Sequence, residues 1–159
     1  MESEHKQELI KAIQTSFIDY AIDSNLALQT RFISNNYKEG KKVVSAIEDQ
    51  LKNCEEFMMS VAFITDGGLK PLLQMLEELN QRGVKGRVLT TNYKNFTSPK
   101  ALETLASLDN IQVRMAYIPE GKPGFHTKGY IFKKEQSYKA IIGSSNLTLY
   151  ALTQNQEWN

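Results

Sequence analysis

The sequence predicts an α/β fold, with a mixed and mostly parallel β-sheet flanked by helices on both faces. Apolar runs of strand length alternate with amphipathic segments of helical length, and this order is typical of parallel strands joined by helical crossovers. The last two apolar runs are separated only by a short polar turn, so they predict an antiparallel hairpin. The chain has 159 residues, 41% of them hydrophobic, which is enough for one domain with its own core.

The elements follow from hydrophobic periodicity and from turn residues. Apolar residues at helical spacing predict helices over residues 4–21, 41–54, 69–83 and 97–108. Ser98 and Pro99 suit the N-cap and the first position of the last of these helices. Strands are expected over residues 57–64, 84–91, 111–118, 125–133 and 138–143. We expect residues 1–39 to form an N-terminal helix and an irregular lead-in, and residues 40–159 to form the α/β domain.

Composition excludes several classes of protein. The 19 lysines and arginines nearly balance the 18 aspartates and glutamates, so the net charge gives no evidence about a nucleic-acid partner. The single cysteine, Cys54, excludes a disulfide framework within the chain and a multi-cysteine zinc site. The charged N-terminus does not look like a secretory signal, and no apolar stretch approaches the ~20 residues of a membrane helix. We therefore expect a soluble, cytoplasmic protein without membrane association.

The stretch "GFHTKGYIFK" contains a histidine, His126, two residues before a lysine, Lys128. On a strand these two side chains point to the same face. An imidazole beside a fixed positive charge suits phosphoryl chemistry, which depends on positioning and charge neutralisation. The simpler interpretation is that both side chains face water. The other histidine, His5, lies in the charged N-terminal helix, and we expect it to be solvated.

The second strand of the hairpin ends in "GSSN", residues 143–146, and the hairpin would bring this end close to His126. The side chains of Ser144 and Asn146 can donate hydrogen bonds to a phosphate, and the glycine at the start allows a close approach of the backbone. Alternatively, these side chains cap a short helix that begins near Thr148.

Together these residues resemble the motif of the phospholipase D superfamily, which is His-x-Lys, four residues, Asp, and then Gly-Ser-x-Asn. The resemblance implies that His126 is the nucleophile and that Lys128, Ser144 and Asn146 bind the substrate phosphate. Small bacterial nucleases of this superfamily also have a glutamate shortly after the second element, hydrogen-bonded to the catalytic histidine. Glu157 stands at the matching distance, although an exposed acid at a strand entry is an equal alternative on sequence alone.

One position departs from the family pattern. The aspartate of the motif is expected at position 133, where this chain has Lys133. The nearest acid, Glu135, is out of register by two residues, so it is not assigned the role. In the family this aspartate is largely structural, and the resemblance therefore still implies the phosphate chemistry.

The resemblance also implies a mechanism and an assembly. In the superfamily one histidine attacks phosphorus to form a phosphohistidine and a second histidine protonates the leaving oxygen. Because this chain has one His-x-Lys, the second histidine must come from another copy, and we expect a homodimer in which two His126 residues face each other across a two-fold axis. No metal and no cofactor is expected, because Lys128 and its copy would neutralise the phosphate. The implied fold is the phospholipase D-like α/β/α sandwich.

Partners are indicated by the wider chain. Stretches such as "SVAFITDGGL" and "FTSPKALETLASL" resemble the phospholipase D-like module at the N-terminus of bacterial superfamily 2 DNA/RNA helicases, over roughly residues 40–159. The abrupt end of the sequence is then explained by a helicase motor downstream. Between residues 121 and 146 there are five lysines and one glutamate, which favours a polyanion such as DNA, although these lysines could merely solvate the hairpin. The sequence thus predicts a nuclease domain, or else a catalytically weak or silent module that binds nucleic acid or dimerises.

Overall fold

The computed structural model describes residues 4–7, 9–10 and 30–159. The chain divides into two compact units, residues 1–33 and 34–159. In the first unit, residues 4–7 and 9–10 are helical, as predicted for the helix over residues 4–21. The other residues of this predicted helix, residue 8 and residues 11–21, lie outside the described residues.

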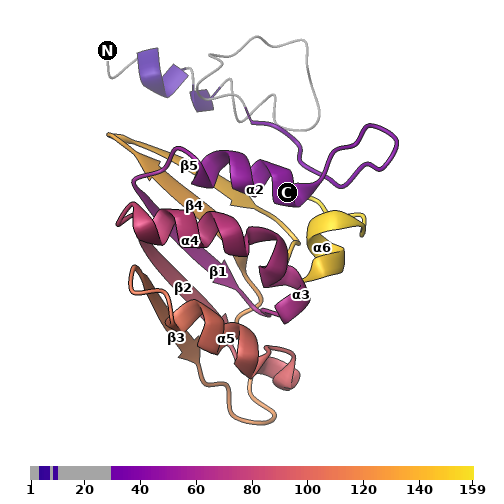
Figure 1. Ribbon diagram of the computed structural model, residues 1–159. Helices are drawn as coiled ribbons and strands as arrows, with labels where there is room; N and C mark the ends of the chain where they lie inside the picture. Colours follow the sequence, from indigo (N-terminus) through magenta and orange to yellow (C-terminus); the bar gives the residue numbers. More distant parts are fainter. Residues whose placement is uncertain (1–3, 8, 11–29) are drawn as a thin grey trace. The chain divides into compact units, whose positions relative to one another are not determined.

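The second unit is built on a five-stranded sheet (Figure 1). Its strands are β1 (Glu56–Val61), β2 (Lys85–Thr91), β3 (Ile111–Ala116), β4 (Lys128–Lys134) and β5 (Ser137–Ile142). Their order across the sheet is β3-β2-β1-β4-β5. The pairs β1–β2 and β2–β3 are parallel, whereas β1–β4 and β4–β5 are antiparallel. The mixed α/β sheet and the terminal hairpin are therefore confirmed, and β4 is the one reversed strand of the five.

The helices of the second unit are short. They are α2 (Val43–Leu51), α3 (Asp66–Leu69), α4 (Leu73–Gln81), α5 (Pro99–Ala106) and α6 (Leu149–Thr153), with 3₁₀ turns at Lys70–Leu72 and Tyr93–Asn95. The predicted N-cap of α5 is confirmed, because Oγ of Ser98 accepts a hydrogen bond from the backbone N–H of Ala101. Pro71, expected in the first turn of one continuous helix, instead lies in the 3₁₀ turn between α3 and α4.

The structure corrects one detail of the predicted layers. Helices α2, α4 and α5 all lie over the same face of the sheet (Figure 1). Along β2, Val88 on that face is buried, whereas Arg87 and Leu89 on the other face are exposed. Within residues 34–159, the second face is thus not covered by helices. The prediction of two covered faces relied on the apolar run of β1, but β2 and β3 alternate polar and apolar residues, which is the pattern of a sheet with one open face.

The buried residues of the covered face join the sheet to the helices. Most of the largest fully buried side chains come from β1, β4, α2, α4, α5 and α6, and they include Phe57, Met59, Tyr130, Ile47, Leu76, Leu105 and Leu152. Burial of one such side chain contributes roughly 1.5–3 kcal/mol. This core fixes the ends of β1, β2, β4 and β5, and these ends carry the residues described next.

One edge of the sheet collects polar residues from several strands. β1, β2 and β5 end at this edge and β4 begins there, because β4 alone is reversed. Two buried threonines, Thr90 and Thr91, fix it: their hydroxyl groups donate to the carbonyl of Ala62 over 3.3 and 3.0 Å. We call it the carboxyl edge. Loops at the carboxyl ends of strands are the usual place for a ligand site in such sheets.

Candidate active site at the carboxyl edge

His126 and Lys128 lie together at the carboxyl edge. β4 begins at Lys128, so His126 precedes the strand in which we expected it. The side chain of Lys128 is only 7% exposed and shares the helix-covered face with Tyr130. Its Nζ atom turns back and donates to Nδ1 of His126 over 2.5 Å and to the carbonyl of His126 over 2.7 Å. The interpretation that both side chains simply face water is therefore wrong for Lys128.

The contact with Lys128 favours one tautomer of the imidazole. An ammonium group can only donate, so Nδ1 of His126 accepts and the neutral ring carries its proton on Nε2. Partial burial and, after it, the charge of Lys128 lower the pKa of His126. Burial also lowers the pKa of Lys128, and the carboxylate of Glu157 opposes this effect. The lowered pKa of His126 thus favours a neutral imidazole beside Lys128.

Two aromatic rings hold His126 in place. Phe63 follows β1 and Tyr93 follows β2, and their ring centroids lie 5.5 and 6.3 Å from that of His126, both edge-on. Phe96 packs edge-on against Phe63 at 5.2 Å. The sequence analysis did not identify these aromatic residues. The available signal was that Phe63 lies near the end of one predicted strand, 57–64, and that Tyr93 and Phe96 follow the next, 84–91.

Ser144 and Glu157 form a second cluster with the end of the chain. Oγ of Ser144 donates to Oε2 of Glu157 and accepts from the backbone N–H of Trp158 over 3.1 Å. The backbone N–H of Ser144 donates in turn to the carbonyl of Trp158 over 3.0 Å. Glu157 is only 9% exposed. It was predicted to contact His126, but the structure pairs it with Ser144.

The glycine of the "GSSN" stretch allows this close approach. A Cβ atom on Gly143 would lie 2.0 Å from the carbonyl oxygen of Trp158 and 2.5 Å from Cα of Asn159. Asn159 also makes two hydrogen bonds with Ser145. Its Oδ1 accepts from the backbone N–H of Ser145, and its Nδ2 donates to the hydroxyl of Ser145. The segment 157–159 is thereby held against the end of β5.

Asn146 serves as a link between strand ends. Its Oδ1 accepts from the backbone N–H of Phe63 over 3.1 Å, so the amide is held at the carboxyl edge. The short helix expected as the alternative does exist as α6, and its N-cap is Thr148. Ser144 bonds Glu157 rather than a free N–H of this helix, so capping does not account for Ser144.

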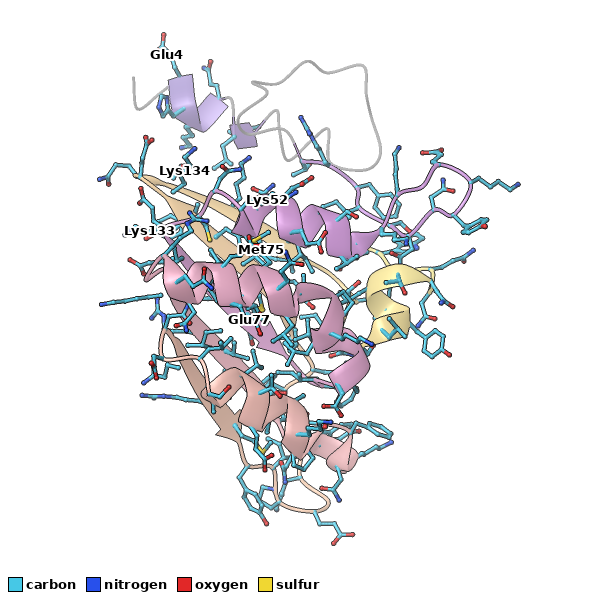
Figure 2. All side chains as sticks on the ribbon, viewed as in Figure 1. Glu4, Lys52, Met75, Glu77, Lys133 and Lys134 are labelled. Carbon is cyan, nitrogen blue, oxygen red and sulfur yellow. The ribbon has the colours of Figure 1, made fainter. Side chains whose placement is uncertain are left out.

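Lys133 lies at the opposite end of β4 from Lys128. Its Nζ atom pairs with Oε1 of Glu56 on the neighbouring strand over 3.2 Å, and this hydrogen bond raises the pKa of the lysine. Figure 2 shows Lys133 and Lys134 at the hairpin end of β4. The residue that replaces the family's aspartate thus has a structural partner and does not contact the histidine–lysine pair.

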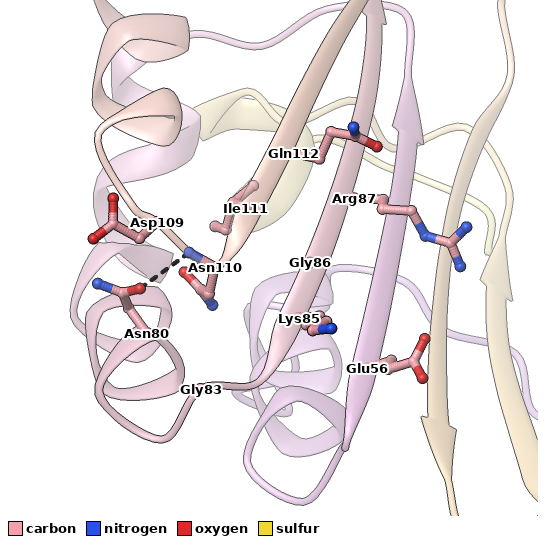
Figure 3. A pocket seen from close by; sticks show the side chains of 10 residues that line it. All are labelled: Glu56, Asn80, Gly83, Lys85, Gly86, Arg87, Asp109, Asn110, Ile111 and Gln112. Carbon is pink, nitrogen blue, oxygen red and sulfur yellow. Dashed lines mark hydrogen bonds between the residues drawn. The ribbon is translucent and has the colours of Figure 1, made fainter.

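A cavity of about 770 Å³ lies at the other edge of the sheet, where β1, β2 and β3 begin. Figure 3 shows its lining residues, which include Glu56, Asn80, Lys85, Arg87, Asn110 and Gln112. None of the residues predicted for the active site lines it. Within the described part of the chain, no cluster of His, Cys, Asp and Glu side chains could hold a metal ion, and no helix is long and apolar enough to cross a membrane.

Comparisons with known proteins identify the family and the fold. A family model described as "Cardiolipin synthase, PLD-like domain" matches residues 47–159. No curated protein matches the chain significantly. Among solved structures, NucT from Helicobacter pylori superposes with a TM-score of 0.63 at 14% identity, covering 80% of each chain. Nuc from Salmonella typhimurium, described as a phospholipase D family member, gives 0.56 at 19% identity, over 81% of this chain and 83% of that one.

A larger protein shares the same fold in part. Polyphosphate kinase from Porphyromonas gingivalis gives a TM-score of 0.55 at 13% identity, over 96% of this chain and 22% of the kinase. At these identities the solved structures establish a common fold, whereas the family model covers most of the sequence. The chain therefore belongs to the PLD-like domain family that this model describes.

Proposed function

We propose that the protein is a metal-independent phosphodiesterase that cleaves DNA through a phosphohistidine intermediate. The observation that carries the proposal is the contact of Nζ of Lys128 with Nδ1 of His126 at the carboxyl edge. It joins an imidazole, whose pKa is lowered by partial burial and by the charge of Lys128, to a buried lysine. The chain belongs to the PLD-like domain family, and these residues resemble the motif of the phospholipase D superfamily. Ser144 and Asn146 lie on the adjacent segment and would complete the phosphate site.

The chemistry proceeds in two displacements. Nε2 of His126 attacks phosphorus, so that a P–N bond forms and the P–O bond to the leaving oxygen breaks. The leaving oxygen takes a proton from His126 of a second copy, which we propose to complete the site as a homodimer. Water then attacks phosphorus, gives its proton to the second histidine, and displaces the first histidine as the P–N bond breaks.

The resting geometry identifies what must change before attack. With Lys128 donating to Nδ1, the proton of the neutral ring lies on Nε2, the nitrogen that must attack. An anionic phosphate oxygen accepts from Lys128 more strongly than a neutral imidazole does. Phosphate binding would thus free Nδ1 to take the proton and leave a lone pair on Nε2. Glu157 would then be released from Ser144 to accept from Nδ1, as carboxylates do in other triads.

Cleavage of single- and double-stranded DNA in excess chelator tests the proposal. We expect the wild-type protein to cleave, a His126→Ala variant to be inactive, and a His5→Ala variant to match the wild type. Cleavage that stops on adding chelator, or that survives in His126→Ala, would contradict the mechanism. Light scattering measures the oligomeric state. Full activity of a monomeric protein would contradict an active site shared between two copies.

One observation favours a second candidate, a catalytically silent module that binds nucleic acid or dimerises. In the structure Glu157 bonds Ser144 and not His126, so the imidazole lacks the carboxylate that would orient it. Tight DNA binding without turnover by a well-folded dimer would support this alternative.

We also propose that the domain works beside a superfamily 2 helicase motor, on the strength of the resemblance over residues 40–159. A protein that contains both parts should cleave faster when ATP is supplied. An unchanged rate with ATP would count against this partnership.

A further inference from the structure

A second cavity lies beside the candidate active site, at the carboxyl ends of β2 and β3. It has a volume of about 620 Å³ and is lined by two loops, residues 92–95 and 117–122. Pockets of this size hold small-molecule or nucleotide-sized ligands. Tyr93 lines this cavity and also packs edge-on against His126 at 6.3 Å. The side chain of Tyr93 is therefore shared by the cavity and the candidate active site.

The two loops are held together by a specific contact. The amide of Asn92 donates to the carbonyl of Ile118 over 3.2 Å, and its oxygen accepts from the backbone N–H of Ile118 over 2.6 Å. In addition, the hydroxyl of Thr91 accepts from the backbone N–H of Tyr93 over 3.1 Å. The two loops that line the cavity are thus joined by paired hydrogen bonds, which favours a preformed site over a chance gap between loops.

The backbone next to Tyr93 is strained. Lys94 and Asn95 have φ angles of 50° and 53°, a region that residues other than glycine rarely occupy. Such strain is retained where surrounding structure enforces it, and it concentrates at ligand sites. Here it places the ammonium group of Lys94 5.5 Å from the centre of the Tyr93 ring. A positive charge and an aromatic face are thereby presented together.

The remaining walls have the same character. Tyr117 is 77% exposed, so the loop presents a large aromatic ring to solvent. Lys122 lines the cavity with Lys94, and Glu120 is the one acid among its lining residues. Aromatic rings flanked by lysines are the features with which proteins bind single strands, by stacking on bases and neutralising phosphates.

We propose that this cavity is a base-binding subsite for an unpaired nucleotide next to the scissile phosphate. The strand would place one phosphate at His126 and Lys128, pass over Tyr93, and stack the neighbouring base in the cavity against Tyr117. The inference rests on the proposed function in placing the scissile phosphate, and it adds a preference for single-stranded nucleic acid. In a duplex the neighbouring base is paired and stacked, so it cannot enter the cavity.

Binding of a fluorescent oligonucleotide tests the subsite. The measurement uses the full chain in a His126→Ala background, which prevents cleavage. Stacking on one aromatic side chain is worth roughly 5- to 140-fold in affinity. We therefore expect Tyr117→Ala to weaken binding of a single strand about tenfold, at the lower end of this range because the ring is exposed. Tyr117→Phe should bind like its parent, since the aromatic face is retained.

Two controls make the test specific. Tyr138 on β5 is 63% exposed and does not line the cavity, so Tyr138→Ala should leave affinity unchanged. The parent, which is the His126→Ala protein, should bind an otherwise identical strand without bases only weakly. Adding Tyr117→Ala should not weaken the binding of this abasic strand any further. DNA and RNA strands of one sequence show whether the sugar matters. The subsite would be overturned if the parent bound the intact and the abasic strand with equal affinity, and if Tyr117→Ala changed neither affinity.

The outcome is separable from that of the proposed function. Binding is read without turnover, so a protein that cleaves nothing can still show the loss caused by Tyr117→Ala. Conversely, a protein that cleaves in chelator but binds equally well with Tyr117→Ala would keep the proposed function and lose the subsite. A preference for duplex over single strand would also contradict the subsite.

Discussion

The two edges of the sheet are both polar, yet they differ in how their polar groups are used. At the carboxyl edge, buried Lys128 contacts His126, and Glu157 contacts Ser144. At the opposite edge the larger cavity is lined by solvated charges such as Lys85 and by Asn110, whose Oδ1 is buried without a hydrogen-bond partner in the described structure. The size of a cavity is thus not the criterion by which we propose the active site. The proposal follows the contact between a histidine and a buried lysine.

The largest expected difference between the two edges concerns the removal of a lysine side chain at each. Lys128→Met should lower cleavage on the order of 10²–10³-fold, as removal of one charge-stabilising donor does in other enzymes. Lys85→Met is the matched variant at the opposite edge, where it lines the larger cavity, and should leave the rate unchanged. Initial rates on one DNA substrate measure both, with circular dichroism as the check on folding. Equal losses in the two variants would remove the functional distinction between the edges.

An intermediate effect on stability is expected from a glycine-to-alanine substitution at each edge. A Cβ on Gly143 would meet the carbonyl of Trp158, and one on Gly86 would meet the ring of Phe57 at 2.2 Å. Each alanine should therefore destabilise the fold, by about 1–3 kcal/mol for such overpacking. Urea unfolding measures this cost.

The two glycine variants should differ in activity per folded molecule. Only Gly143→Ala displaces the segment that carries Glu157, so only this variant should lose cleavage under conditions where both are folded. If Gly86→Ala loses as much, the segment 157–159 has no role in the site beyond stability.

The smallest effect concerns the pKa of His126. Partial burial and the charge of Lys128 lower this pKa below its ordinary value near 6.5. Lys128→Met should raise it part of the way back, because burial remains, whereas Lys85→Met should not change it. NMR titration in a His5→Gln background, which leaves a single histidine, measures the shift. A pKa unchanged by Lys128→Met would show that the contact between the two side chains does not form in solution.

The sign of the related stability effect follows from the same shift. A folded-state pKa below the unfolded value means that folding disfavours the imidazolium. The contribution of His126 to stability is therefore complete above the unfolded value near 6.5 and is lost as the pH falls through the lowered pKa. Because His126 is exposed overall, we expect only a small change in the unfolding midpoint, which His126→Gln should abolish.

Several features could be predicted because they depend on neighbouring residues. Turn length determined the β4–β5 hairpin, and the Ser98-Pro99 pair determined the start of α5. The positions of His126 and Lys128, two residues apart, ensured that they lie close together. The pairing of Glu157 could not be predicted in this way. Its partner depends on how the last residues fold back against Gly143, and the family spacing indicated His126 instead of Ser144.

The sequence by itself determined the alternation of strands and helices, the terminal hairpin and the proximity of the histidine to the lysine, because each is set by local periodicity or short turns. Only the tertiary structure decided that α2, α4 and α5 lie over the same face of the sheet and that Phe63 and Tyr93 pack edge-on against the imidazole. It also decided that a cavity opens beyond Tyr93. These features depend on which strands become neighbours, and the order β3-β2-β1-β4-β5 brings together loops that are far apart in the chain.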